Sequence, residues 1–311
     1  MAPKVSVVGS YGVGLTFGLQ RFPAAGETVL CRYHRVEHGG KGSNQSVAAA
    51  RLGAEVRLRT ALGDDAFADK ANQLWQEEGV EARVVVRSGE PTMTGAVLVE
   101  QGGDNRIVVA PGALAGLAPE HIEPCDVAGS DVLLVQLEIP LPAARRALEL
   151  AASEGVRSIL NPAPVPDATA EELAELLALA DIITPNVTEA RSLLGRGEEA
   201  GPAELASSLA ATGRSVVVTA GPHGAFVASD GAVTHVEACP VREVVDSTGA
   251  GDTFTAALGV AVGEGATLVE AARFASVAAA HCVSVAGVLP SLPNRRQLRE
   301  PELPAALEVR S

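Results

Sequence analysis

Aromatic residues are scarce in this chain: they make up 3% of its 311 residues, whereas hydrophobic residues as a whole make up 47%. The core must therefore consist mainly of small and branched apolar side chains. Such side chains suit close packing of helices on a sheet. A hydrophobic share of this size is ample for a large core.

Basic residues are also few. The chain has 24 Lys and Arg against 38 Asp and Glu, which gives a net charge of −14. It lacks the basic footprint of proteins that bind nucleic acid, so we expect no nucleic-acid partner. An anionic ligand would need a local positive field, from helix ends, a metal ion or a few basic residues.

The sequence has no paired cysteines and no long apolar run. Cys31, Cys125, Cys239 and Cys282 are scattered without a CxxC pair, so we expect neither a zinc site nor a disulfide framework, but idle thiols in a reducing cytoplasm. No stretch of 18 apolar residues predicts a membrane span. The first residues, MAPKVSVVGS, enter a strand-like run without the features of a signal peptide.

Short apolar runs alternate with helical patterns along most of the chain. Strands are expected at 5–9, 56–61, 132–136, 158–161, 182–184 and 216–219, and helices at 44–52, 66–78, 142–153, 171–179, 188–194 and 203–211. This alternation predicts an α/β fold: a doubly wound, mostly parallel sheet with helices on both faces. We interpret residues 1–311 as one domain that ends in a helix and a loose end.

Two stretches interrupt this alternation. Residues 12–38 and 92–110 look like extended segments with turns, and 94–100 and 106–110 flank a turn that predicts a hairpin. We expect these segments to form a small β-stranded lid over a pocket. Exposed lid strands could also support a homodimer.

A Gly-Ala-Gly turn opens an apolar helical stretch in DSTGAGDTFTAALG, residues 246–259. Glycines allow the backbone to approach a ligand, and the N–H groups of a first helical turn can bind an anion. Asp252 lies inside this turn, where its charge would repel a phosphate. A general base beside a phosphoryl group would explain that carboxylate. By itself, the turn also fits an ordinary helix start with an acidic residue.

A second glycine-rich segment, HGGKGSNQ at 38–45, precedes another helical stretch. It is not a Walker A motif, because position 35 is Arg and a glycine follows Lys41. The glycines at 9–14 do not match the dinucleotide-binding GxGxxG spacing either. Taken alone, this segment fits a flexible loop.

Together, the two segments resemble the two signatures of the ribokinase family, the PfkB-type carbohydrate kinases. The first signature corresponds to 39–54 and the second to 246–259. Further segments at 22–28, 136–138, 161–164, 183–189 and 219–221 follow the order and spacing of that family. The resemblance covers nearly the whole chain and implies phosphoryl transfer from ATP, with Mg²⁺, to a hydroxyl of a ribose-like sugar.

The resemblance also implies roles for individual residues. Asp252 would be the catalytic base, and the amides of Gly249, Ala250 and Gly251 would form the anion hole for the γ-phosphate. The sugar-binding positions would be Gly40, Lys41, Asn44 and Glu138. The ATP-binding positions would be Asn186, Glu189, Thr219, Gly221 and Ser276, of which Asn186 and Glu189 would organise Mg²⁺ largely through water. An activating monovalent cation, expected to be K⁺, would be held by Asp246, the Thr248 carbonyl, Gly287 and Ser291.

The chain departs from the family just after the first strand. Sugar kinases of the family usually carry an Asn and an Asp there, which hold substrate hydroxyls; here Gly12 and Gly14 stand in their places. Sites that hydrogen-bond a hydroxyl discriminate by up to about 10⁴-fold, so the acceptor preference should change. A bulkier substrate could fill the space, or Tyr11 or Thr16 could supply the contact.

Two alternatives remain open from the sequence. One is a nucleoside kinase of the same fold. The other is a catalytically silent sugar sensor, which would have no need for Asp252 or for the intact turn around it.

Overall fold

A computed structural model describes residues 1–102 and 104–298. The expected hairpin turn includes residue 103, and the expected C-terminal helix and loose end fall largely on 299–311. These residues lie outside the described part of the chain.

The main sheet has nine strands in the order β13-β12-β11-β10-β9-β8-β1-β4-β5. Their bounds, in chain order, are β1 Lys4–Val8, β4 Glu55–Leu62, β5 Val80–Val86, β8 Val132–Gln136, β9 Arg157–Asn161, β10 Ile182–Ile183, β11 Ser215–Thr219, β12 Ala225–Ser229 and β13 Ala232–Val236. The strands from β5 to β11 run parallel, and β12 and β13 are antiparallel additions at one edge. Such a sheet must be covered on both faces.

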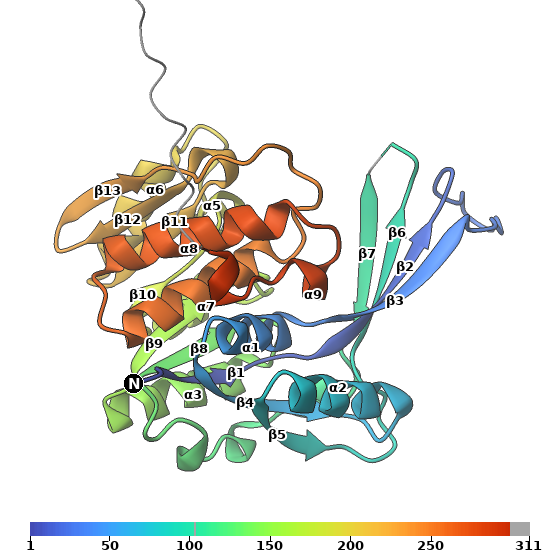
Figure 1. Cartoon of the computed structure of the whole chain (residues 1–311), viewed down its shortest axis with the longest axis horizontal. Helices are drawn as coiled ribbons and strands as arrows, with labels where there is room; N and C mark the ends of the chain where they lie inside the picture. Colours follow the sequence, from blue (N-terminus) through green and yellow to red (C-terminus); the bar gives the residue numbers. More distant parts are fainter. Residues whose placement is uncertain (103, 299–311) are drawn as a thin grey trace, which may run out of the picture.

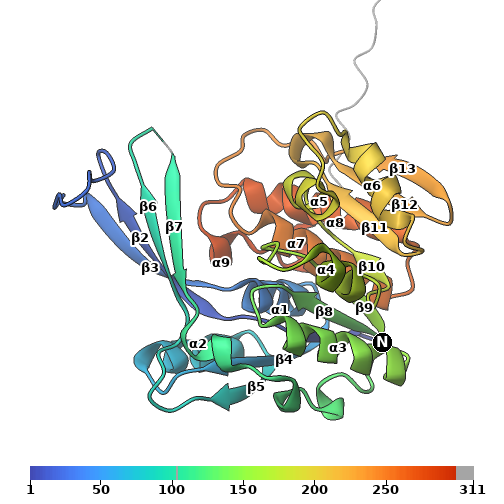
Figure 2. The same cartoon turned by 180° about the vertical axis from the view of Figure 1, so that it is seen from behind.

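Helices cover both faces of the sheet. On the face seen in Figure 1 lie α1 (Lys41–Arg51), α2 (Ala66–Glu77), α7 (Ala250–Gly263) and α8 (Leu268–Val283). On the face seen in Figure 2 lie α3 (Leu141–Glu154), α4 (Ala170–Leu177), α5 (Val187–Leu194) and α6 (Pro202–Ala210). The buried apolar side chains form two clusters, one on each face. The predicted doubly wound fold is confirmed.

Short elements complete the chain. Helix α9 (Val288–Ser291) follows α8, and 3₁₀ turns occur at Gly112–Gly116, Pro119–His121, Pro124–Asp126, Gly221–His223 and Arg295–Gln297. No helix in the described residues is both long enough and apolar enough to span a bilayer.

A second sheet of four strands projects from the main body (Figure 1). Its order is β3 (Tyr33–Gly39), β2 (Gly12–Gly18), β6 (Thr94–Val99), β7 (Asn105–Ala110). Strands β6 and β7 form the predicted antiparallel hairpin, and β2 pairs with β6 in parallel. We call this sheet the lid.

Strand β1 has β8 on one side and β4 on the other, so the strand order reverses beside it. In open α/β sheets, ligands bind outside the carboxyl ends of the strands at such a point. The polar segments singled out in the sequence come directly after β1, β8, β9, β10 and β11. The topology therefore gathers them at one edge of the sheet.

Candidate active site

The turn before α7 presents backbone donors beside a buried carboxylate. Gly249 is the N-cap of α7 and has φ 84°, a left-handed conformation that favours glycine. Within the described residues, the N–H groups of Gly249 and Gly251 form no hydrogen bond, whereas the N–H of Ala250 donates to the Ser247 carbonyl at 3.3 Å. The turn thus offers two free amides at a helix N-terminus, an arrangement that binds anions.

The carboxylate of Asp252 is only 8% exposed. Asn44 Nδ2 donates to Asp252 Oδ2 at 2.8 Å, and Gln45 Nε2 donates to Asp252 Oδ1 at 3.2 Å. Both donors come from the first turns of α1, which packs against α7. These bonds compensate in part for removing a charge from water and fix the direction of the carboxylate.

A buried relay of hydrogen bonds holds the side chain of Gln45 in place. Gln136 Nε2, at the end of β8, donates to Gln45 Oε1 at 2.6 Å. Gln45 Nε2 also lies 3.4 Å from Asn161 Oδ1, and Asn161 Nδ2 donates to the Thr184 carbonyl at 2.8 Å. The sequence analysis did not single out these residues as site residues. Gln136 and Asn161 each end a buried strand, and Gln45 lies in the first turns of α1. All three fall within the segments that resembled the family, but nothing in those segments indicated that the three side chains meet.

A cavity of about 230 Å³ opens in front of Asp252. It is lined by Lys41, Asn186, Glu189, Thr219, Gly249, Gly251 and Asp252, and also by Asn161, Ala163, Thr184, Ser247 and Thr255. The structure therefore brings together seven of the predicted site residues.

Lys41 supplies the positive charge of this cavity. Burial disfavours its ammonium group, but the carboxylates of Asp252, Glu138 and Glu189 outweigh burial, so the pKa of Lys41 lies above its ordinary value. Within the described residues, Lys41 forms no ion pair. A lysine in this position suits an anionic ligand.

Asn186 and Glu189 begin helix α5 as a capping box. Asn186 Oδ1 accepts from Glu189 N at 2.8 Å, and Glu189 Oε2 accepts from Asn186 N at 2.8 Å. Burial raises the pKa of Glu189, and the nearby Asp252 carboxylate raises it further. The bond from Asn186 and the charge of Lys41 oppose this rise but do not cancel it. A cation in the cavity would relieve that repulsion. The oxygen donors fit Mg²⁺ held largely through water.

Glu138 and Gly40 border the start of α1. Glu138 Oε2 accepts from Ser10 Oγ at 2.5 Å and from Lys41 N at 2.8 Å. Gly40 has φ 89°, and a Cβ there would lie 2.6 Å from Tyr11 Cα, so only glycine fits. Both residues therefore shape the approach to Lys41 and Asn44.

The four predicted cation-holding residues also lie together. Asp246 accepts from Thr248 N at 2.9 Å and from Gly287 N at 3.0 Å. Cys282 Sγ lies 3.1 Å from Ser291 Oγ and 3.7 Å from the Thr248 carbonyl. The group offers a carboxylate, a carbonyl and a hydroxyl, which are hard oxygen donors that fit an alkali cation.

The predicted nucleotide positions are less concentrated. Thr219 lines the cavity, while Gly221 is exposed in the turn after β11. Ser276 is buried in α8 and lies outside the lining of this cavity. Its neighbours Val277 and Ala280 line a separate depression with 239–245.

Gly12 and Gly14 have different surroundings. A Cβ on Gly12 would lie 2.5 Å from Met93 Cε, so Met93 already fills that position. The nearest atom to a Cβ on Gly14 would be the Glu37 carbonyl at 3.8 Å, an ordinary contact, and Gly14 does not have a positive φ. The expectation of open space is therefore wrong for Gly12, and at Gly14 there is room.

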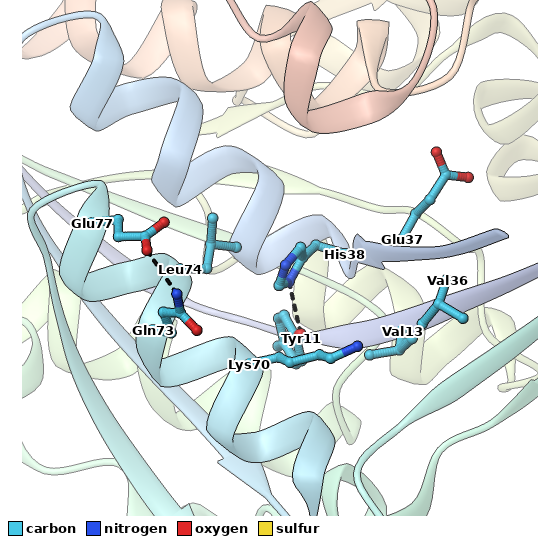
Figure 3. A pocket seen from close by; sticks show the side chains of 9 residues that line it. All are labelled: Tyr11, Val13, Val36, Glu37, His38, Lys70, Gln73, Leu74 and Glu77. Carbon is cyan, nitrogen blue, oxygen red and sulfur yellow. Dashed lines mark hydrogen bonds between the residues drawn. The ribbon is translucent and has the colours of Figure 1, made fainter.

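The suggestion that Tyr11 supplies the missing contact is also wrong. Tyr11 is 0% exposed and packs edge-on against Trp75 at 5.3 Å between ring centroids. Its hydroxyl pairs with His38 Nδ1 at 2.9 Å. Figure 3 shows this pair beside α2, in a second cavity of about 260 Å³. Alternation along β2 puts that cavity on the face opposite to Gly12 and Gly14.

Comparison with known proteins agrees with this geometry. The model of the pfkB family of carbohydrate kinases matches residues 2–295. The chain belongs to this family. The ribokinase of Haemophilus influenzae is 35% identical over 307 residues, which cover 96% of this chain and 98% of that protein. The deoxyribokinase of Salmonella typhimurium is 30% identical over 308 residues, which cover 95% of this chain and 97% of that protein.

Solved structures share the fold of this chain. The structure of Arabidopsis thaliana ribokinase complexed with ribose and ATP has a TM-score of 0.86 and 32% identity, and covers 96% of this chain and 98% of that chain. A Burkholderia thailandensis nucleoside kinase in complex with inosine has a TM-score of 0.80, with 94% of each chain covered. At 21% identity, it shows a common fold alone.

The relay behind Asp252 leads to a prediction. Gln45→Met keeps the length of the side chain but removes the donor to Asp252 Oδ1. We expect kcat to fall by about tenfold or more, since a hydrogen bond to a charged group is worth about 1.5–3 kcal/mol.

Ser46→Ala is the matched control, because Ser46 lies next in α1 and bonds only the Gly42 carbonyl. Its kcat should match that of the wild type. Urea unfolding of both variants shows whether each is folded. A stably folded Gln45→Met with an unchanged kcat would contradict the positioning role.

Proposed function

We propose that the protein transfers the γ-phosphate of ATP to a primary hydroxyl of a ribose-like carbohydrate. The observation that carries the proposal is the buried Asp252 carboxylate, held by two amides beside two free backbone N–H groups. Phosphoryl transfer needs little covalent chemistry from the protein and depends on position and charge. The turn before α7 can supply both position and charge, because it holds a base beside a site for an anionic phosphate.

In this proposal, Asp252 accepts the proton of the acceptor hydroxyl while the hydroxyl oxygen attacks the γ-phosphorus of ATP. The bond from that phosphorus to ADP breaks as the new bond forms. The amides of Gly249 and Gly251, and that of Ala250 once it leaves Ser247, receive the charge of the γ-phosphate. Lys41, which lines the same cavity, stabilises the same charge. Gly40, Asn44 and Glu138 complete the acceptor site.

The donor nucleotide would extend from this turn along the ends of β10 and β11. Asn186 and Glu189 would hold hydrated Mg²⁺ near the phosphates, and Thr219, Gly221 and Ser276 would contact the nucleotide. Mg²⁺ would neutralise the charge that develops on the phosphates. Asp246, Thr248, Gly287 and Ser291 would hold K⁺ beneath the turn.

Two other functions are compatible with the fold. A nucleoside kinase would phosphorylate a sugar with a base attached, and a silent sensor would bind a sugar without turnover. Measuring ATP consumption with a panel of pentoses, hexoses and nucleosides separates the three. The four free cysteines support our proposal of a reducing, cytoplasmic location.

The role of Asp252 is tested by Asp252→Asn. The amide cannot accept the hydroxyl proton, so we expect kcat to fall by about 10²–10⁴-fold. The affinity for ATP should stay within a few-fold of the wild type, which isothermal titration measures. A variant that keeps more than about half of the wild-type kcat would refute the assignment.

The cation site predicts that KCl supports higher activity than NaCl or LiCl at equal ionic strength. A bound cation would order the turn whose amides face the phosphate. It should also raise the melting temperature, because it binds the folded state. Ser291→Ala should reduce both effects; equal rates and melting temperatures in all three salts would remove the cation site.

We also propose that the lid forms a homodimer. The edge strand β7 exposes Ile107, Val108 and Val109, at 57%, 70% and 55%, and unpaired apolar edges invite pairing. Val108→Lys should yield a monomer in sedimentation velocity. The control is Val86→Lys, at a 61% exposed position of the main sheet edge, which should leave assembly unchanged. A wild type that is monomeric at all concentrations would exclude the dimer.

A further inference from the structure

The two faces of the β2–β3 ladder have different partners. Val13 and His38 face α2, as Figure 3 shows, together with the buried Tyr11. Gly14 and Glu37 are paired across the two strands, so their side-chain positions share the opposite face. Alternation along the strands therefore separates Glu37 from the residues around Tyr11.

The Glu37 carboxylate reaches toward the loops that carry the anion site. Its Oε1 lies 3.5 Å from the position of a Cβ on Gly287. Gly287 N is bonded to Asp246, whose loop continues into Gly249 and α7. Glu37 borders the cavity of Figure 3, but its carboxylate points away from Tyr11 and His38. It therefore lies between the open position at Gly14 and the start of α7.

This carboxylate is partly buried and forms no hydrogen bond or ion pair within the described residues. The neighbouring Asp246 carboxylate is already engaged by the N–H groups of Thr248 and Gly287. Burial disfavours the ionised form of Asp246, yet bonds from Thr248 and Gly287 and the charge of Arg35 outweigh it and lower the pKa of Asp246. A carboxylate that is buried away from water usually has a hydrogen-bond or ion-pair partner. Glu37 is thus free to accept hydrogen bonds from a ligand.

We propose that Glu37 is a specificity-determining residue of the acceptor site, and that it accepts hydrogen bonds from two adjacent hydroxyls of the sugar. The inference rests on the proposed sugar-kinase function. An ionised carboxylate has only acceptors, and two hydroxyls of a sugar supply two donors. The room at Gly14 lets such a sugar lie against β2 while Glu37 holds it from β3.

Steady-state kinetics of Glu37→Ala and Glu37→Gln test the proposal on the acceptor that the wild type uses best. We expect the KM for the acceptor to rise by about tenfold or more in Glu37→Ala. Glu37→Gln should lose less, because its amide oxygen still accepts one bond. The KM for ATP should stay within about twofold.

Glu77→Gln is the matched control. Glu77 lines the cavity on the other face of β2, so this variant removes one negative charge without touching the acceptor face. Its acceptor KM should be unchanged. An equal rise in Glu77→Gln would assign the effect to net charge and overturn the proposal.

A swap of the carboxylate between the strands gives a second test. Gly14 accepts a side chain without a positive φ or a close contact, so Gly14→Asp should fold. In the Glu37→Ala background, Gly14→Asp should recover acceptor binding by several-fold, with a changed preference among sugars. In the presence of Glu37 it should weaken binding, because two carboxylates then face each other.

The outcomes separate this inference from the function on which it rests. A wild type that phosphorylates no sugar would refute the function. Turnover of sugars with unchanged acceptor KM in both Glu37 variants would refute only the role of Glu37. The role of Glu37 would also be refuted if the Glu37 variants lost potassium activation while their acceptor binding stayed unchanged. A preference of the wild type for amino sugars, whose ammonium group would pair with Glu37, would refute it too. Acceptor-induced thermal shifts without ATP supply the binding readout.

Discussion

The buried carboxylate of Asp252 is the constraint on which the rest of the site depends. A carboxylate at 8% exposure is costly unless donors replace its water. Asn44 and Gln45 supply them from α1, so α1 must pack against α7 with its polar first turns inward. Gln136 then ties Gln45 to the central sheet. The position of one charge thereby fixes two helices and a strand relative to each other.

Much of the fold could be predicted from the sequence, because strands, helices and turns depend on residues that are close together in the chain. The six predicted strands and six predicted helices are all present, and the glycine-rich turn before α7 and the lid strands lie where expected. Strands β5, β12 and β13 and helix α8 were not predicted. The two edge strands, β5 and β13, are partly or largely exposed and so lack the buried apolar pattern of the inner strands. The relay of Gln45, Gln136 and Asn161 was missed for another reason: it depends on side chains from three elements far apart in the sequence.

An acidic protein that binds a nucleotide must concentrate its positive charge. The net charge of −14 disfavours anions at long range. Near Asp252, however, the ammonium of Lys41 and two backbone amides, none of them paired within the described residues, line the same cavity. Charged and polar groups close to a ligand in a partly dry site affect it more than distant surface charges do, because salt screens the distant charges. The acidic surface therefore does not conflict with a phosphate-binding site.

Gly12 and Gly14 show why acceptor preference cannot be inferred from residue identity alone. In the sequence they appear equivalent, as two lost side chains on one strand. In the structure, Met93 fills the first position, and only the second stays open. What faces the opening is decided by strand register, which places Glu37 directly across from Gly14. A shift of one residue in that pairing would present His38 or Val36 there instead. If Glu37 holds the acceptor as proposed, the register of β2 and β3 determines the specificity as much as any side chain does.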